Sequence, residues 1–139
     1  MKKIDFKSSR APKPVGFYPH AKKVGDFLFL SGVGPRSIDD NSIPGVTLND
    51  IGEVIDYDIE KQCVAVFENI RFILEESGSS WGNIVDVTVF LTNMKKDFKK
   101  FNVLYKKYFE SCFPCRTTVE VNCLPTPIAI ELKVIATTK

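Results

Sequence analysis

The sequence predicts an α+β fold in which one mixed sheet carries two helices on one face, in the order ββαβαββ. Two short apolar segments flank a Gly-Asp pair, two longer segments have a helical period, and later segments alternate between apolar and other residues. The chain has 139 residues, of which 44% are hydrophobic. This is enough for one core, so residues 1–139 are expected to form a single domain.

The first two strands are expected at residues 21–24 and 27–31. Gly25-Asp26 separates them and suits the tight turn of a β-hairpin. Residues 37–56 are rich in Asp, Asn, Ser, Gly and Pro, which indicates an ordered surface loop.

The two helices are predicted from apolar residues that recur every three or four positions. In the first, Asp58 is the expected N-cap, the periodic residues run from Ile59 to Leu74, and Gly78 supplies a stop. The second covers residues 97–109 and gathers its aromatic side chains on one stripe. Its lysines lie elsewhere, with no aromatic residues among them to stack on bases, so a solvated face is favoured over an RNA-binding one.

The remaining strands are expected at residues 84–92, 116–123 and 128–136. Prolines in 124–127 cannot continue a ladder, so they mark the corner of a hairpin formed by the last two strands. Alternation directs one set of side chains toward the helices: Thr117, Val119, Val121, Cys123, Ile128, Ile130, Leu132, Val134 and Ala136. The opposite face, which suits a subunit interface with a wet pocket, is expected to carry Thr88, Phe90, Arg116, Thr118, Glu120, Asn122, Glu131 and Ile135.

Charge and composition exclude several classes of protein. The formal net charge of +2 argues against a protein built to grip nucleic acid or an anionic membrane. Residues 1–10 lack the apolar region of a secretory signal, and no apolar run is long enough to span a bilayer. A cytoplasmic protein is therefore expected, in which the four cysteines are reduced thiols.

Metal and covalent chemistry find little support. The pair Cys112 and Cys115 has C-x-x-C spacing, but it follows a helix, whereas a thioredoxin-like site precedes one, and no second close pair completes a zinc site. His20 is the only histidine, and a surface or interface imidazole is favoured over a ligand-binding role. Residues 31–34 lack the lysine and the following helix of a phosphate-binding loop. No metal or cofactor is expected.

Arg116 and Glu131 are the strongest candidates for chemistry. A guanidinium fixes a carboxylate through two hydrogen bonds, and a partly desolvated glutamate can exchange protons with water. In the expected final hairpin the two residues would lie about 13 Å apart on one face. They could face one elongated substrate, or each could complete a site with a neighbouring subunit.

Short segments spread over residues 11–136 form a specific pattern: Gly16-Phe17-Tyr18, Ser31-Gly32, residues 88–94, 101–105, 113–116 and 119–121, Leu124-Pro125, Ile130-Glu131 and Ile135-Ala136. The pattern resembles the reactive-intermediate deaminase family, also called Rid or YjgF-type. The resemblance implies a chorismate-mutase-like domain that forms homotrimers with active sites between subunits. It further implies that Arg116 holds a substrate carboxylate, that Glu131 positions the hydrolytic water, and that the pocket is lined by Tyr18, Ser31, Gly32, Asn102 and Thr118.

Residues 11–16, 18–21 and 31–36 resemble the 2-aminomuconate deaminase branch of that family. The expected function is therefore cofactor-free hydrolysis of 2-aminomuconate to 4-oxalocrotonate and ammonia. The alternatives are a general enamine and imine deaminase for substrates such as 2-aminoacrylate, and a regulatory protein that binds small carboxylates without turnover. Ribonuclease activity, ascribed to some relatives, is poorly supported by the near-neutral charge.

A dicarboxylate substrate needs a second cationic partner. Arg116 would neutralise only one carboxylate of 2-aminomuconate, and leaving the other desolvated without a partner would be costly. Arg36 and His20 are the two candidates, because both stand close in sequence to the expected pocket residues.

Overall fold

The structure, a computed structural model, describes all 139 residues. Its elements are, in chain order, β1 (Lys3–Phe6), β2 (Ala21–Val24), β3 (Phe27–Leu30), β4 (Val46–Leu48), β5 (Val54–Tyr57), α1 (Ile59–Glu76), the 3-10 turn η1 (Trp81–Asn83), β6 (Ile84–Leu91), α2 (Met94–Phe109), β7 (Cys115–Glu120) and β8 (Ile130–Thr137).

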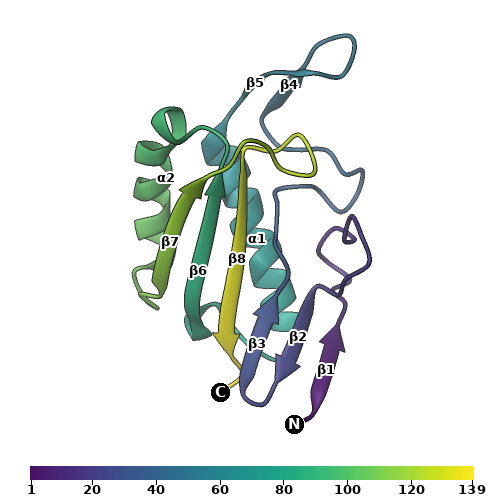
Figure 1. The fold of residues 1–139 in the computed structure, drawn as a ribbon, viewed down its shortest axis with the longest axis vertical. Coiled ribbons are helices and arrows are strands. Elements are labelled where there is room, and N and C mark those ends of the chain that lie inside the picture. The colour runs from purple at the N-terminus through teal and green to yellow at the C-terminus, as the bar shows by residue number, and fades with distance from the viewer.

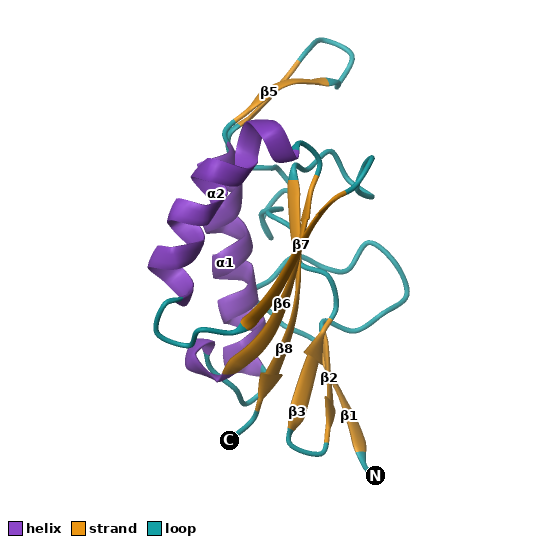
Figure 2. Ribbon diagram, turned by 60° about the vertical axis from the view of Figure 1, so that its left-hand side comes forward, coloured by secondary structure: helices purple, strands orange, loops and turns teal.

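One mixed sheet and two helices make up the body of the molecule (Figure 1). The sheet has six strands in the order β1-β2-β3-β8-β6-β7, and only β6 and β7 run parallel. Both helices lie on the same face of the sheet, which leaves the other face open (Figure 2). The predicted α+β class and the two helices on one face are confirmed.

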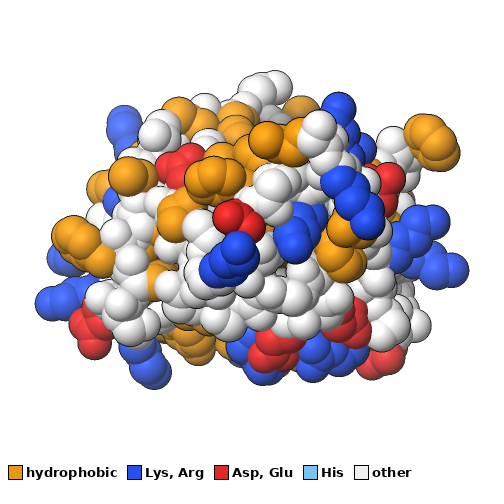
Figure 3. All heavy atoms as spheres, turned by 90° about the horizontal axis from the view of Figure 1, so that it is seen from below, with side chains coloured by type: hydrophobic (Ala, Val, Ile, Leu, Met, Phe, Trp, Pro, Cys, Tyr) orange, Lys and Arg blue, Asp and Glu red, His pale blue; other side chains and the backbone are white.

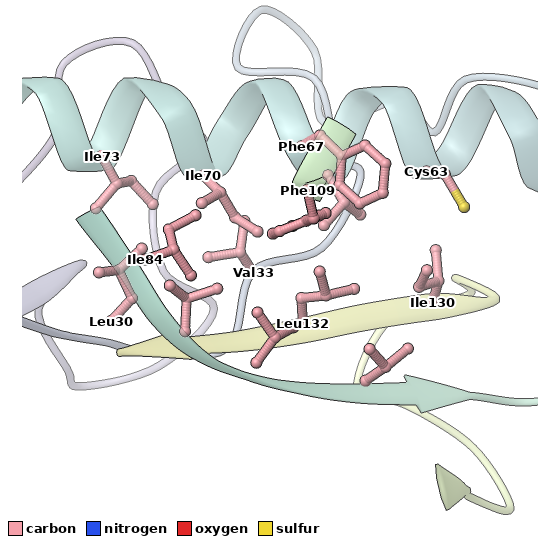
Figure 4. Packing of buried hydrophobic residues seen from close by; sticks show 14 of the residues in the cluster. Leu30, Val33, Cys63, Phe67, Ile70, Ile73, Ile84, Phe109, Ile130 and Leu132 are labelled. Atoms are coloured by element: carbon pink, nitrogen blue, oxygen red, sulfur yellow. The ribbon is translucent and has the colours of Figure 1, made fainter. Parts of the chain in front are cut away.

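The core fills the space between α1, α2 and the sheet. Cys63, Phe67, Ile70 and Ile73 project from α1 toward apolar side chains of β6 and β8 (Figure 4). Burying one such Ile or Phe side chain contributes about 1.5–3 kcal/mol, so this single helix face accounts for much of the stabilisation. The predicted cap holds α1 in place, because Asp58 Oδ1 accepts hydrogen bonds from the backbone N–H groups of residues 60 and 61.

The first hairpin forms as predicted, with β2 and β3 antiparallel about Gly25, whose φ is +60°. Two further pairings were not predicted. The charged segment Lys3–Phe6 adds β1 to the edge of the sheet, and the expected surface loop contains a separate hairpin of β4 and β5 that projects beyond the sheet (Figure 1). Strands of only three or four residues are too short for alternation to predict them.

The second helix begins three residues earlier than predicted. The Asn93 side chain accepts a hydrogen bond from the backbone N–H of Lys96 at 3.1 Å, so the helix starts at Met94. Asp97, the expected first residue, is instead buried within the helix and accepts a hydrogen bond from the Tyr57 hydroxyl at 2.6 Å.

The last two strands do not form a hairpin, and that prediction is wrong. β6 lies between them, parallel to β7 and antiparallel to β8. The helix between β6 and β7 acts as a crossover connection, which returns the chain to the same end of the sheet and so makes those two strands parallel.

The predicted faces of β8 are confirmed, but those of β7 are inverted. Arg116 pairs with Val87 and Thr118 with Val89, and both valines are fully buried under the helices. Because paired residues share a face, Arg116 and Thr118 point to the helix side, and so does Glu120 opposite Leu91. Thr117 and Val119 occupy the open face instead, and Asn122 lies beyond the strand.

The open face carries apolar side chains that nothing in the chain covers. Phe27 and Phe29 are 49% and 40% exposed, and Phe90 and Ile135 are half-buried on the same face. Viewed from the end where the termini lie, apolar side chains form a band among lysines and arginines (Figure 3). Neither helix is long and apolar enough to span a membrane.

Candidate functional site

Glu131 packs against the backbone of Gly32. A Cβ atom at position 32 would lie 2.6 Å from Glu131 Oε2, so only glycine allows the segment after β3 to pass this close to the carboxylate. Burial raises the pKa of Glu131, and the positive charge of Lys133 opposes that rise. A carboxyl group with a raised pKa is suited to accept and return a proton near neutral pH.

Five of the predicted site residues line one small hollow: Tyr18, His20, Ser31, Gly32 and Arg36. The Ser31 hydroxyl donates to the carbonyl oxygen of Pro19 at 2.7 Å, which ties the end of β3 to the loop that bears Tyr18. Gly32 belongs to the hollow and also touches Glu131, so it connects the two parts of the candidate site.

His20 has a structural role, which corrects the expectation of a surface or interface imidazole. It is only 8% exposed, and its Nδ1 accepts a hydrogen bond from the backbone N–H of Ser8 at 2.8 Å. Its Nε2 lies 2.7 Å from the carbonyl oxygen of Pro12, which can only accept, so Nε2 carries the proton. With both nitrogens engaged, His20 fastens residues 8–12 to the sheet and has no free donor for a carboxylate.

Arg36 braces the loops around the same hollow. Its Nη1 donates to Asn41 Oδ1 at 2.9 Å and its Nη2 to the carbonyl oxygen of Lys13 at 2.8 Å. The Asn69 amide on α1 donates to the carbonyl oxygens of Gly34 and Arg36, both at 3.0 Å, and fixes the backbone there. A second substrate carboxylate at Arg36 would therefore compete with existing hydrogen bonds.

Arg116 lies at the other margin of the sheet, against α2. Its Nη1 donates to Asn102 Oδ1 at 2.9 Å, and its guanidinium carbon is 4.7 Å from the centre of the Tyr105 ring. This contact orients the guanidinium plane through a cation–π interaction. The hydrogen bond to Asn102 is the only one that the Arg116 guanidinium makes within the chain, so its other donors are available to a carboxylate.

Two unpartnered hydroxyls accompany Arg116. Thr118 Oγ1 and Tyr105 Oη are buried without a hydrogen-bond partner in the chain. Sequence reasoning placed Thr118 in the pocket but took Tyr105 only as part of an aromatic stripe. Its spacing of three residues from Asn102 on one helix face is the signal that could have identified it.

Arg116 and Glu131 do not share a pocket within one chain. Arg116 points to the helix side and Glu131 to the open face, and β6 separates their strands. Arg116 pairs with Val87 and Glu131 with Phe90, and these two partners are three residues apart on β6. Three residues along the strands and two strand spacings across them place the backbones of Arg116 and Glu131 about 14 Å apart. The chain thus carries two separate groups of candidate residues. The arginine group, on the helix side of the sheet, consists of Arg116, Asn102, Tyr105 and Thr118. The glutamate group consists of Glu131, which lies on the open face, together with Gly32 and the hollow.

The cysteines do not form a reactive centre. All four are free, and the chain has no group of three or more His, Cys, Asp or Glu side chains placed to hold a metal ion. Burial raises the pKa of Cys112, which keeps it protonated and weakly nucleophilic, and Cys115 is exposed at the start of β7.

The fold and the two groups of residues place the chain among α+β proteins of the Rid/YjgF type. The crystal structure of yeast Mmf1 has a TM-score of 0.85 and 34% identity and covers 99% of this chain and 100% of that one. Escherichia coli TdcF with bound serine has a TM-score of 0.82 and 29% identity, covering 96% and 98%.

Sequence comparison identifies the family. The sequence model described as Endoribonuclease L-PSP matches residues 8–138. A RutC family protein of Pyrococcus abyssi is 42% identical over 129 residues, which are 93% of this chain and 92% of that protein. The chain belongs to the endoribonuclease L-PSP family, which contains the RutC and Rid proteins.

Proposed function

We propose that the protein is a cofactor-free hydrolytic deaminase of enamine and imine acids that works as a homotrimer with sites between subunits. The observation that carries the proposal is the placement of Arg116 and Glu131 on opposite faces of one sheet. Each has unused hydrogen-bonding capacity, so two copies of the chain could unite the arginine group of one with the glutamate group of the next. The uncovered apolar face offers a surface on which such copies could pack.

The proposed reaction needs only positioning and a proton carrier. The enamine tautomerises to the imine while Arg116 binds the adjacent carboxylate through two hydrogen bonds. Glu131 takes a proton from water as the water oxygen bonds to the imine carbon. That proton passes to the imine nitrogen and completes the carbinolamine. Glu131 then carries the proton of the new hydroxyl group to the amino nitrogen, the C–N bond breaks, and ammonia leaves as the carbonyl forms. The serine bound to TdcF is a small amino acid, which agrees with a site for this class of substrate.

The cations around the site bear on the choice between two candidate substrates. 2-Aminomuconate, the candidate from the resemblance of residues 11–36, requires a partner for its second carboxylate. The side chains of Arg36 and His20 already form hydrogen bonds within the chain, so neither is free to bind a second carboxylate. This observation favours the second candidate, a monocarboxylate such as 2-aminoacrylate. The ratio of ammonia release rates on the two substrates distinguishes them.

The proposal is tested by ammonia release from each substrate by the parent protein and two variants. Arg116→Lys keeps the charge but not the two-pronged contact, and should lose about 2–4 kcal/mol of transition-state binding. Glu131→Gln should lower kcat more than it raises KM. Lys99→Met on the exposed face of α2 serves as the control. Parent rates in both site variants would refute the assigned roles, and a parent that binds substrate without turnover would support the regulatory alternative.

A further inference from the structure

We infer that Lys133 is a positioning residue that holds the Glu131 side chain in its charged form while leaving both carboxylate oxygens free for water. The inference rests on the proposed function, in which Glu131 acts as the base. Sequence reasoning did not select Lys133, because an exposed lysine in a strand is ordinary by itself.

The strand geometry sets Lys133 beside Glu131. The two residues alternate with the fully buried Leu132 on β8, so both lie on the open face, about 7 Å apart along the strand. The Lys133 ammonium donates to the carbonyl oxygen of Leu30 at 3.0 Å. Leu30 ends β3 two residues before Gly32, so the lysine is tied to the same segment that packs on the carboxylate.

This tether separates the ammonium from the carboxylate oxygens. No ion pair or hydrogen bond joins Lys133 to Glu131, although the two charges interact through space. A direct ion pair would occupy an oxygen that has to accept a proton from water. A tethered ammonium that does not touch the carboxylate stabilises the negative charge without that cost.

No other ionisable side chain faces Glu131 from the elements packed against it. On β6 the partners of Glu131 and Lys133 are Phe90 and Thr88, and residues 30–32 are uncharged. The titratable groups of the nearby hollow are Tyr18, His20 and Arg36, and the last two are held by backbone or amide oxygens. Burial raises the pKa of Glu131, and Lys133 is the group that lowers it.

The inference is tested by titrating the Glu131 carboxyl directly. Protein labelled with ¹³C at the glutamate carboxyl carbons gives one resonance for each glutamate, and the resonance missing from Glu131→Gln assigns Glu131. The titration is compared among the parent protein, Lys133→Met, Lys133→Arg and the control Lys99→Met. Lys133→Met should raise the midpoint by about half to one pH unit, whereas Lys133→Arg and Lys99→Met should leave it unchanged.

A second measurement needs only the folded parent. Added salt weakens the interaction between the two charges, so 1 M salt should raise the Glu131 midpoint in the parent protein toward that of Lys133→Met. The rise should be smaller than the one the substitution causes, because partly buried charges are screened less. If the protein deaminates, the apparent pKa of the acidic limb in the pH profile of kcat/KM should rise in Lys133→Met by the same amount as the Glu131 midpoint. An unchanged midpoint in Lys133→Met, or an equal shift in Lys99→Met, would overturn the inference. Because the titration requires no turnover, its failure is distinct from failure of the deaminase proposal.

Discussion

Two inactive variants should restore activity when they are combined in one oligomer. In each chain Arg116 and Glu131 lie on opposite faces of the sheet, about 14 Å apart. A site that uses both must therefore take the arginine from one subunit and the glutamate from its neighbour. Arg116→Lys subunits still supply an intact Glu131, and Glu131→Gln subunits still supply an intact Arg116.

The size of the recovery follows from the symmetry. In a cyclic trimer assembled from equal amounts of the two variants, each site receives an intact arginine in half of the cases and an intact glutamate in half. About one quarter of all sites should then be complete, which corresponds to one third of the sites in the mixed trimers once these are purified. Since Arg116→Lys alone should have lost about 2–4 kcal/mol of transition-state binding, or about 30-fold to 1,000-fold in kcat/KM, recovery above the level of that variant is easily measured.

The assay is ammonia release after the two variants are unfolded together and refolded, with a different affinity tag on each so that mixed oligomers can be purified. Light scattering should give about three times the chain mass of 15.7 kDa. Two differently tagged batches of Arg116→Lys, refolded together, form the matched control. Mixed oligomers that contain both variants but show no gain over this control would refute a shared site, and a stable, fully active monomer would do the same.

Three further predictions concern single residues. Gly32→Ala should reduce kcat about tenfold or more with little change in stability, because the new methyl group displaces the flexible Glu131 carboxylate from its position 2.6 Å away. Arg36→Ala should depress kcat/KM for 2-aminomuconate and for 2-aminoacrylate to a similar extent, because Arg36 is engaged by Asn41 and Lys13 and braces the loops around the hollow. The third prediction concerns Glu76. Burial alone would raise the pKa of its carboxyl group, but hydrogen bonds from Ser9 and Arg10 bring that pKa down to about 2. The unfolded chain therefore binds more protons between pH 4.5 and 2, so the free energy of unfolding should fall across this range by on the order of 1 kcal/mol, and less in Glu76→Gln.

Each of these predictions has a contrary result. Parent turnover in Gly32→Ala would show that the carboxylate position is not critical. A much larger loss on 2-aminomuconate than on 2-aminoacrylate in Arg36→Ala would instead assign Arg36 to a second substrate carboxylate. Urea unfolding at several pH values measures the Glu76 effect, and identical pH profiles of the parent protein and Glu76→Gln would show that this carboxylate does not stabilise the fold.

Local signals in the sequence were sufficient for much of the secondary structure. The helical period and the Asp58 cap located α1, the Gly25-Asp26 pair located the first hairpin, and strict alternation assigned the faces of β8. These features depend on contacts within a few residues or on one strongly buried face, so they are visible in a single sequence. Arg116 was selected for its chemistry and Asn102 from the resemblance, and the structure joins the two by a hydrogen bond.

Strand order and the faces of an edge strand were decided by tertiary structure. The alternation around Arg116 suggested that Val119 and Thr117 point inward, because valine is the more apolar choice. In the folded chain the reverse holds, since β7 is an edge strand beside β6 and the aromatic side chains of α2 accept the Arg116 guanidinium on that side. No local sequence signal specifies which strands pair with each other in the sheet.

The sequence by itself therefore determined the class of fold, most helix and strand positions and the identity of the candidate site residues. Only the tertiary structure decided that Arg116 and Glu131 belong to opposite faces, that His20 is a buried fastener and that Lys133 stands beside Glu131. The physical reason is that periodicity reports which side chains share a face within one element. The pairing of elements depends on long-range burial and on the handedness and reach of the connections between them.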